Sequence, residues 1–299
     1  MRDREELKRR LDAAGLGSVA DRIVALSRPC YRIERTLTPE DQIPLGASKF
    51  GGLPDVPADF TWPRIPGQRY AEPVEFVGQV RLADLPEPLP EPLPHDGLLS
   101  FFARWSEGQV FYFPQGTPLE RSPSPNPEVA PAPEGFWQKL KAEFKRNPDP
   151  RQTYRSCTLK FVHAFSAPDG DHSTIRALKL SDDDSEVYSE QVLESPDEPP
   201  AVTYAIQHQM LGHARPVQNE MELECDHIRD GSAMRWDLPQ ERFIKASQEW
   251  VLLLQVDTDD CKEGPGWMWG DAGMLYFWIH RDDLAARVFN KVVMMAQCG

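Results

Sequence analysis

The chain has 299 residues, with 33 Lys and Arg against 47 Asp and Glu, which gives a formal net charge of −14. Such a charge repels phosphate backbones and anionic lipid surfaces on average, so neither nucleic acid nor a membrane is expected as a main partner. The N-terminus lacks the apolar core of a signal peptide, and no apolar run approaches the ~20 residues that cross a bilayer, so a cytoplasmic location is predicted.

The cysteines and prolines narrow the class of fold. The five cysteines are far apart and never form a Cys-x-x-Cys pair, so neither a disulfide framework nor a zinc knuckle is indicated. Reduced, mostly buried thiols are expected instead. The 29 prolines are about twice the ordinary usage and predict many ordered loops.

Two short amphipathic helices are predicted at the N-terminus. Residues 3–14 carry apolar side chains at helical spacing, and a second helix runs from the capping box at Ser18 to the limit set by Pro29. Residues 1–29 are therefore predicted to form a helical segment that packs on the rest of the chain.

The region that follows is typical of loops and strands. Residues 48–63, which include Trp62, contain three prolines and two adjacent glycines. This composition excludes a helix and predicts an ordered loop pinned to the core by its apolar side chains. Runs of apolar and β-branched residues predict strands at 76–82, 97–105, 109–114, 157–165, 250–256 and 274–279.

Three segments between the strands differ in composition. The Pro-rich stretch 117–133 is predicted to be extended, and residues 134–146 to form a basic helix that docks on the sheet or binds a partner. The acidic segment 181–198 opens with a capping box and is predicted to be a helix with a solvated face.

Two pairs of strands recur at one spacing. The strand around Gln79 aligns with the strand around Gln255 at an offset of 255 − 79 = 176, and the strand that follows each of them repeats this offset. A weaker match relates Gly52 to Gly212 at 212 − 52 = 160. Two strands in one register argue for a repeated unit.

The pattern predicts an α+β, β-rich fold of two similar, mostly antiparallel β halves, an internal duplication, with the N-terminal helices packed on them. The first half spans residues 30–165 and includes the Pro-rich insertion, the second spans 166–299, and both belong to one compact unit. Because a buried amide must be hydrogen-bonded, Gln79 and Gln255 are expected either to clamp backbone across the repeat or to face a shared cleft.

Several motifs together resemble one known family. They are Lys49-Phe-Gly-Gly-Leu-Pro-Asp-Val-Pro, Trp62-Pro63, residues 76–82, Gly97-Leu-Leu-Ser-Phe-Phe, Gln209-Met-Leu-Gly, Gln218, Met221-Glu-Leu-Glu-Cys and Trp269-Gly-Asp-Ala-Gly-Met-Leu-Tyr-Phe-Trp-Ile. On these residues the chain resembles the YwqG-like family, a group of mostly bacterial proteins with a domain of unknown function. The resemblance implies a β-rich fold of two similar halves and transfers no catalytic residue. Because some relatives look like neighbours of secreted-toxin genes, it implies toxin neutralisation as a role by association.

Motifs for common catalytic and cofactor sites are not found. The chain has no Gly-x-Ser-x-Gly elbow, Walker loop, dinucleotide-binding glycine pattern or His-Glu-x-x-His, so no cofactor is predicted. Four residues offer soft metal ligands but lack the paired spacing of zinc sites, so no metal site is predicted. These four are His208, His213, Cys225 and His227.

The loop before the last strands collects acidic and aromatic residues. Its carboxylates suit acid–base work or a hard cation, with turn capping as the commoner role. They are Asp257, Asp259, Asp260 and Asp271. Trp267 and Trp269 suit stacking on a planar or sugar ligand, or a cap on the core.

The sequence predicts a binding module whose Gly/Pro/Trp loops form a cleft for a protein partner such as a toxin, or for a small ligand. The alternative is a hydrolase-type enzyme that uses clustered carboxylates near the repeat junction, namely Glu220, Glu222, Asp257 and Asp271. The candidate binding residues are Trp62, Gln79, Gln209, Gln218, Glu220, Glu222, Gln255, Asp257, Trp267, Trp269 and Asp271. No catalytic residue is assigned.

Overall fold

The computed structural model describes residues 1–66, 71–104, 107–122, 154–193 and 206–299. Its central feature is a ten-stranded antiparallel sheet with the strand order β14-β13-β12-β11-β1-β10-β2-β6-β7-β8. The sequence prediction of a β-rich, mostly antiparallel fold is therefore confirmed. The predicted Pro-rich stretch from residue 123 onward and the predicted basic helix 134–146 lie outside the described residues.

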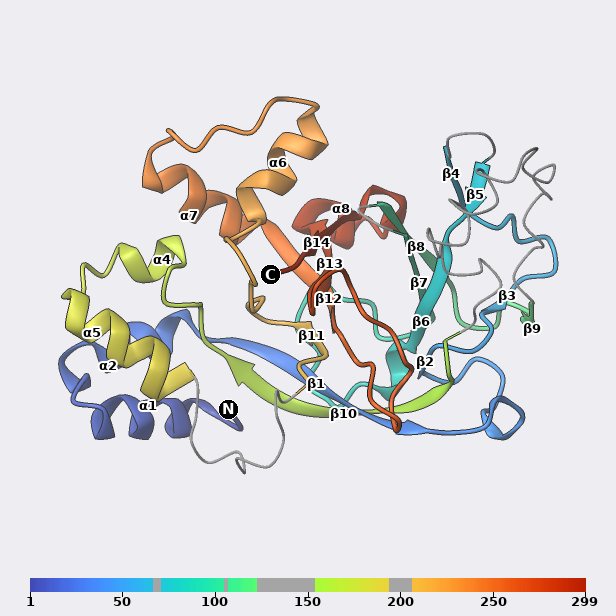
Figure 1. The fold of residues 1–299 in the computed structure, drawn as a ribbon, viewed down its shortest axis with the longest axis horizontal. Coiled ribbons are helices and arrows are strands. Elements are labelled where there is room, and N and C mark those ends of the chain that lie inside the picture. The colour runs from blue at the N-terminus through green and yellow to red at the C-terminus, as the bar shows by residue number, and fades with distance from the viewer. Residues whose placement is uncertain (67–70, 105–106, 123–153, 194–205) are drawn as a thin grey trace, which may run out of the picture.

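Two long strands form the middle of the sheet (Figure 1). β1 (Arg28–Leu37) pairs with β10 (Cys157–Ser166) over its whole length. Four strands continue the sheet on each side of this pair. On the β10 side they are β2 (Lys49–Phe50), β6 (Glu75–Arg81), β7 (Leu98–Arg104) and β8 (Glu107–Phe113). On the β1 side they are β11 (Gln209–Leu211), β12 (Trp250–Asp257), β13 (Met274–His280) and β14 (Val293–Gln297).

The sheet is nearly closed because its two edge strands approach each other. A Cβ atom added to Gly108 in β8 would lie 2.7 Å from the Cβ atom of Met294 in β14. The enclosed space holds the main core, which contains Tyr31, Phe50, Phe101, Phe277 and Trp267. Curving the sheet in this way lets strands from distant parts of the chain bury one shared set of apolar side chains.

Short elements complete the β part of the molecule. Two small sheets pair β3 (Asp55–Val56) with β9 (Glu120–Arg121) and β4 (Arg64–Pro66) with β5 (Ala71–Pro73). Single helical turns are η1 (Glu40–Gln42), η2 (Leu82–Asp84), α8 (Arg281–Ala285) and η4 (Phe289–Lys291).

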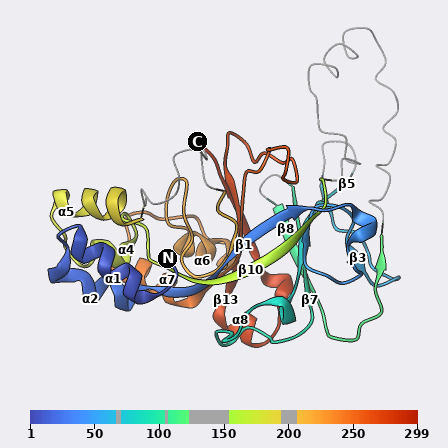
Figure 2. The ribbon, with the colours of Figure 1, turned by 90° about the horizontal axis from the view of Figure 1, so that it is seen from below.

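A group of helices lies at one end of the long strands (Figures 1 and 2). It comprises α1 (Arg4–Ala13), α2 (Gly17–Leu26), α4 (Ser173–Arg176), α5 (Asp182–Val187) and the π-helix η3 (Tyr188–Leu193). The predicted N-terminal helices are present, but their apolar stripe packs chiefly on other helices. Leu7 and Leu11 share one buried cluster with Tyr188 and Val192 of η3. The predicted acidic helix is therefore amphipathic, and it covers the N-terminal pair.

A helical hairpin packs on the β12–β14 side of the sheet, and its second helix contacts α4 of the first helix group (Figure 1). It consists of α6 (Glu222–Asp230) and α7 (Gln240–Glu249). Leu223 and Phe243 of the hairpin pack with Trp250 and Trp278 of the sheet. No helix among the described residues is both long enough and apolar enough to cross a membrane.

Candidate functional site

Gln79 spans a loop of the β10 side. The buried side chain accepts a hydrogen bond at Oε1 from the Asp55 backbone N–H (3.0 Å), and its Nε2 donates to the Ala47 carbonyl (2.8 Å) and to Asp55 Oδ2 (2.8 Å). Between these contacts the loop turns through Gly51 and Gly52, whose φ angles are +60° and +67°. Glycine adopts this left-handed region without the steric cost that other residues incur. Gln79 therefore fastens the loop to β6.

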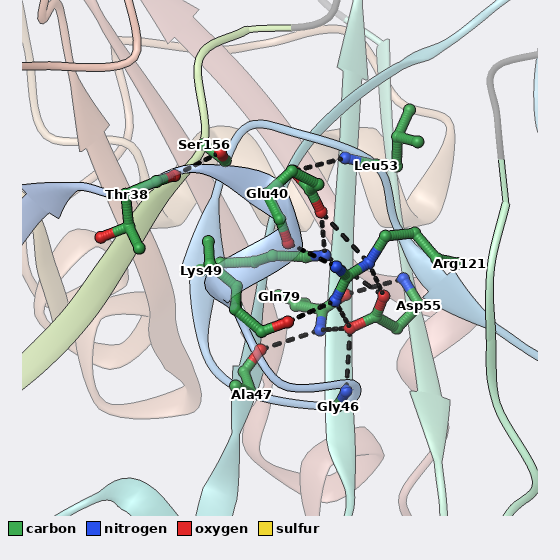
Figure 3. Close-up of polar contacts among 11 residues, drawn as sticks. Thr38, Glu40, Gly46, Ala47, Lys49, Leu53, Asp55, Gln79, Arg121 and Ser156 are labelled. Atoms are coloured by element: carbon green, nitrogen blue, oxygen red, sulfur yellow. Dashed lines mark hydrogen bonds and ion pairs between the residues drawn. The ribbon is translucent and has the colours of Figure 1, made fainter.

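A buried ion-pair cluster surrounds this loop (Figure 3). Lys49 is fully buried, and its Nζ lies 2.8 Å from Glu40 Oε1 and 3.2 Å from Asp55 Oδ1. Arg121 Nε lies 2.9 Å from the same Asp55 oxygen. Burial would raise the pKa of Asp55, but the Arg121 hydrogen bond and the Lys49 charge lower it below its ordinary value. Two cations thus balance two carboxylates, and the cluster joins η1, the loop and β9.

Gln255 makes the corresponding bridge on the other side of the sheet. Its Oε1 accepts from the Arg215 backbone N–H at 2.8 Å, and its Nε2 donates to the Gln207 carbonyl at 2.9 Å. The bridged loop turns through Leu211 and Gly212, with φ angles of +60° and +76°. Gln209 braces the same turn by donating to the Leu211 and His213 carbonyls. Each of the two predicted glutamines clamps the loop beside its own strand.

The candidate tryptophans are hydrogen-bonded parts of the core. Trp267 is buried, and its Nε1 donates to the Asp257 carbonyl at 2.8 Å, a group that also accepts from Trp269 Nε1 at 3.3 Å. Tyr154 lies edge-on to both indoles, with ring centroids 5.3 and 5.8 Å away. Trp62 donates to the Val74 carbonyl at 2.8 Å. These contacts favour the role of a cap on the core over that of an open stacking platform.

Two further candidates lie near the C-terminal strand. Gln218 Nε2 donates to the Cys298 carbonyl at 2.8 Å, and the Asp271 carbonyl accepts from the Gly299 backbone N–H at 3.2 Å. The Asp271 side chain is exposed. Both residues hold the end of β14 in place.

A second polar cluster joins β1 to the loop after β12. Asp259 is buried and accepts two hydrogen bonds from Arg35, at 2.6 Å from Nε and 3.0 Å from Nη2. His208 Nε2 lies 3.4 Å from Asp259, and its Nδ1 accepts from the Asp257 backbone N–H. Burial raises the pKa of Asp259, but the His208 and Arg35 hydrogen bonds outweigh it and hold the pKa well below its ordinary value. Burial lowers the pKa of His208, so this imidazole is neutral at pH 7.

The third cluster contains two of the candidate carboxylates and one histidine. His172 precedes α4 and caps its N-terminus, Glu222 is the first residue of α6, and Glu220 lies two residues before it. His172 Nε2 lies 3.4 Å from Glu222 Oε1 and 3.8 Å from Glu220 Oε2. Glu220 also accepts from the Ser173 backbone N–H at 3.0 Å and from Arg176 at 2.8 Å. An imidazole and two carboxylates therefore converge on one buried point.

The charge state of this cluster follows from its surroundings. Burial alone would raise the pKa of Glu222, but the His172 hydrogen bond and the positive charge of Arg28 lower it, so Glu222 is ionised at neutral pH. Nδ1 of His172 accepts from the Thr174 backbone N–H at 3.2 Å, which places the proton of a neutral ring on Nε2, facing Glu222. The sequence offered no motif for this histidine, because it lies 50 residues before Glu222.

The structure gathers the sequence candidates only in part. Among the four carboxylates of the hydrolase alternative, Glu220 and Glu222 meet, whereas Asp257 lies beside His208 and Asp271 at an exposed turn. The four soft-ligand candidates do not converge. His208 contacts Asp259, His213 donates to the Leu26 carbonyl, Cys225 is buried in the α6–α7 cluster and His227 contacts Ser232.

Comparison with known proteins gives a family but no activity. The model of a domain of unknown function, DUF1963, matches residues 48–298. The chain belongs to the DUF1963 family. The DUF1963 region includes all candidate residues from Trp62 to Asp271, and it begins after α1, α2 and β1. A search of curated proteins returned no match. The expectation of a family without an assigned activity is confirmed, while the narrower YwqG-like name stays a prediction.

Proposed function

We propose that this DUF1963 protein is a binding module for a protein partner with a positively charged surface. The supporting observation is the acidic face of α5 and η3. Its exposed carboxylates are Asp182, Asp183, Asp184, Glu186 and Glu190. No described Lys or Arg forms an ion pair with them, and the chain as a whole carries a net charge of −14. Complementary charge of this kind steers a basic partner and raises its association rate.

Helix stability explains only part of this acidic face. Asp182, Asp183 and Asp184 occupy the first turn of α5, where the helix dipole favours negative charge. Glu186 and Glu190 lie beyond that turn and gain nothing from the dipole, so their exposure supports a role in recognition. The predicted binding of a small ligand gains less support. The side chains of Gln79, Gln255 and the tryptophans form hydrogen bonds with the protein's own loops, so these groups are not free to bind a ligand.

The resemblance to proteins encoded beside secreted toxins suggests what such a partner would be. A toxin with a basic surface would agree with that gene neighbourhood, and it would be attracted by the negative charge of α5 and η3. This protein would then neutralise the toxin by covering the toxin's basic surface. Such a role would require no catalytic residue in this chain.

Affinity capture from the native host tests the proposal. The wild type is compared with a variant that carries Asp183→Asn, Glu186→Gln and Glu190→Gln, and with a control that carries Glu91→Gln, Asp230→Asn and Glu241→Gln at other exposed sites. Both variants change the net charge by the same amount. We expect a stoichiometric basic partner that the first variant loses and the control retains, with weaker capture at high salt. Recovery of no such partner, or equal capture by both variants, would contradict the proposal.

A hydrolase-type enzyme is the second candidate, and one observation favours it. His172, Glu220 and Glu222 bring a potential base and two carboxylates together. Broad substrate screening of the wild type and of a Glu222→Gln variant tests this role. If both give the same null profile, the enzyme proposal fails.

We also propose that the two sides of the sheet derive from an internal duplication. β6 and β12 each carry a bulge against the next strand, between Phe76 and Gly78 in β6 and between Leu252 and Leu254 in β12. The residues on either side of the two bulges are separated by the same offset, 252 − 76 = 254 − 78 = 176. Packing alone gives no reason for the same backbone shift to occur at corresponding places in two strands.

The glutamine bridges support the duplication with a second offset. Gln79 joins the backbone of Ala47 and Asp55, and Gln255 joins that of Gln207 and Arg215, where 207 − 47 = 215 − 55 = 160. The test is an experimental structure in which β2, β6, β7 and β8 are superposed on β11, β12, β13 and β14. A duplication requires one rotation to align all four strands, and the need for a different rotation for each pair would refute it.

A further inference from the structure

We propose that His172, Glu220 and Glu222 bind one divalent transition-metal ion, for which Zn²⁺ is the reference ion. One imidazole nitrogen and two carboxylates form a mixed donor set that suits Zn²⁺ and its neighbours in the first transition row. Ca²⁺ and Mg²⁺ prefer sites made of oxygen atoms alone. Within the described part of the chain, this is the one group of three such residues whose ligand atoms all lie within 4.8 Å of one another.

The spacing of the donor atoms fits a shared ion. Two ligands that each lie about 2.1 Å from Zn²⁺ at a tetrahedral angle are about 3.4 Å apart. His172 Nε2 lies 3.4 Å from Glu222 Oε1 and 3.8 Å from Glu220 Oε2. Small side-chain rotations therefore bring all three donors into coordination without moving the backbone.

Burial gives an independent reason to expect a cation here. Glu222 is 4% exposed, and its oxygens accept from the backbone N–H of Met221 at 3.1 Å and lie 3.4 Å from the His172 ring. Buried carboxylates are paired with a cation or bind a metal. Arg28 contributes positive charge nearby, but its Nη2 donates to the Ser247 carbonyl at 2.8 Å. An ion between Glu222 and His172 would supply the missing close partner.

A hydrogen-bond acceptor for the other nitrogen of the His172 ring is already in place. When Nε2 of a histidine binds a metal, the proton moves to Nδ1 and is donated to a nearby oxygen. Thr174 Oγ1 lies 2.8 Å from His172 Nδ1 and provides that oxygen. Metal binding would give up the hydrogen bond from the Thr174 backbone N–H, so the loss of this cap is its local cost.

Two residues next to the cluster each carry an unpartnered polar atom. Ser173 Oγ and His213 Nδ1 are buried and have no hydrogen-bond partner among the described residues. The His213 ring lies edge-on to the His172 ring, with centroids 5.6 Å apart. These atoms are available to a water molecule that completes the coordination of the ion. The ion itself would join the start of α4 to the start of α6.

Zinc titration by calorimetry tests the site. The test variants are His172→Gln and Glu222→Gln, and the matched controls are His227→Gln and Glu224→Gln, which change the same residue types on α6 outside the cluster. We expect the wild type and both controls to bind one equivalent of Zn²⁺. The two test variants should bind at least about tenfold more weakly, since even the loss of a residue that only hydrogen-bonds to a metal ligand costs about 10–100-fold. Circular dichroism without metal checks that all variants fold.

Nuclear magnetic resonance of the wild-type imidazole nitrogens gives a readout that needs no variant. On addition of Zn²⁺, the Nε2 resonance of His172 should shift and its proton should appear on Nδ1. The inference is overturned if the wild type binds no stoichiometric zinc, if both test variants bind as the controls do, or if zinc shifts other histidines and leaves His172 unchanged. None of these outcomes bears on capture of a protein partner.

Discussion

Phe101 of β7 and Phe277 of β13 pack edge to face in the centre of the molecule, with ring centroids 5.2 Å apart. The two strands are far apart in the sheet order, each second from an edge, so the rings meet across the enclosed space. Their sequence offset, 277 − 101 = 176, equals that of the bulged strands. The contact joins the two sides of the sheet.

A double-mutant cycle measures this contact. Phe101→Leu and Phe277→Leu are each expected to lower the free energy of unfolding by about 1–3 kcal/mol. The double variant should lose less than the sum by about 0.5–1.5 kcal/mol, because the aromatic pair can be broken only once. Urea unfolding of the four proteins gives the coupling. A control cycle that pairs Phe101 with Phe113, which belongs to a separate cluster, should be additive. Additivity for Phe101 and Phe277 would contradict the contact.

The glutamine bridges predict a second effect on stability. Gln79→Ala and Gln255→Ala each leave a loop N–H and a loop carbonyl without their partner. Unsatisfied buried groups cost about 1–3 kcal/mol each, so a loss of about 2–6 kcal/mol per variant is expected in urea unfolding. Gln42→Ala, at an exposed glutamine, should stay within about 0.5 kcal/mol of wild type.

The substitution of glutamate at the same position sharpens this test. Gln79→Glu keeps the acceptor for the Asp55 N–H but replaces a donor by an anion that faces the Ala47 carbonyl and the Asp55 carboxylate. It should therefore destabilise more than Gln79→Ala at neutral pH. The opposite ranking would mean that the loop does not depend on the amide donor.

The positions of these strands were predictable because they depend on local pattern. Apolar runs bounded by glycine and proline predicted the β6, β7, β12 and β13 regions. The pairing of β1 with β10 was not predictable. These strands are some 130 residues apart, and their neighbours are selected by packing of the whole chain and not by local preference.

The segment around Glu220 shows where local pattern misleads. Charged and apolar residues alternate from Glu220 to Cys225, as they do in a half-exposed strand. The chain instead enters a helix at Glu222, because Leu223 and Cys225 pack against Phe243 of α7 and Trp250. The candidate site was predicted only in part, because local pattern does not show which distant residues the fold brings together. Glu220 and Glu222 lie two residues apart and were both candidates from the sequence, whereas His172 reaches them only through the fold.

Gly78 of β6 is expected to tolerate no side chain. A Cβ atom there would lie 2.8 Å from the Lys49 carbonyl oxygen and 2.6 Å from the Phe50 ring. Because the first neighbour is backbone that cannot move aside, Gly78→Ala should lower the free energy of unfolding by about 3 kcal/mol. Gly17→Ala is the control. The nearest atom to its new methyl group is a flexible Asp12 carboxylate oxygen at 3.1 Å, and alanine in α2 should stabilise the protein by up to about 1 kcal/mol.

Asp259 should control stability in acid. Its folded pKa is lowered far below the ordinary value of 3.8, against the effect of burial, by hydrogen bonds from His208 and Arg35. A carboxyl group with a depressed folded pKa contributes stability above its unfolded pKa, and that stability is lost as the pH falls towards the folded pKa. The wild type should therefore lose stability steeply below about pH 4.

Comparison with Asp259→Asn isolates this contribution. At neutral pH the variant leaves the Arg35 guanidinium without its carboxylate, which should cost about 3–5 kcal/mol. Because the variant lacks the titrating group, the difference from wild type should shrink as the pH is lowered from 7 to about 2. Urea midpoints measured at each pH give this difference. Asp271→Asn, at an exposed turn, should follow the wild-type curve throughout. A difference between wild type and Asp259→Asn that is independent of pH would show that the Asp259 carboxylate titrates alike in the folded and unfolded chains.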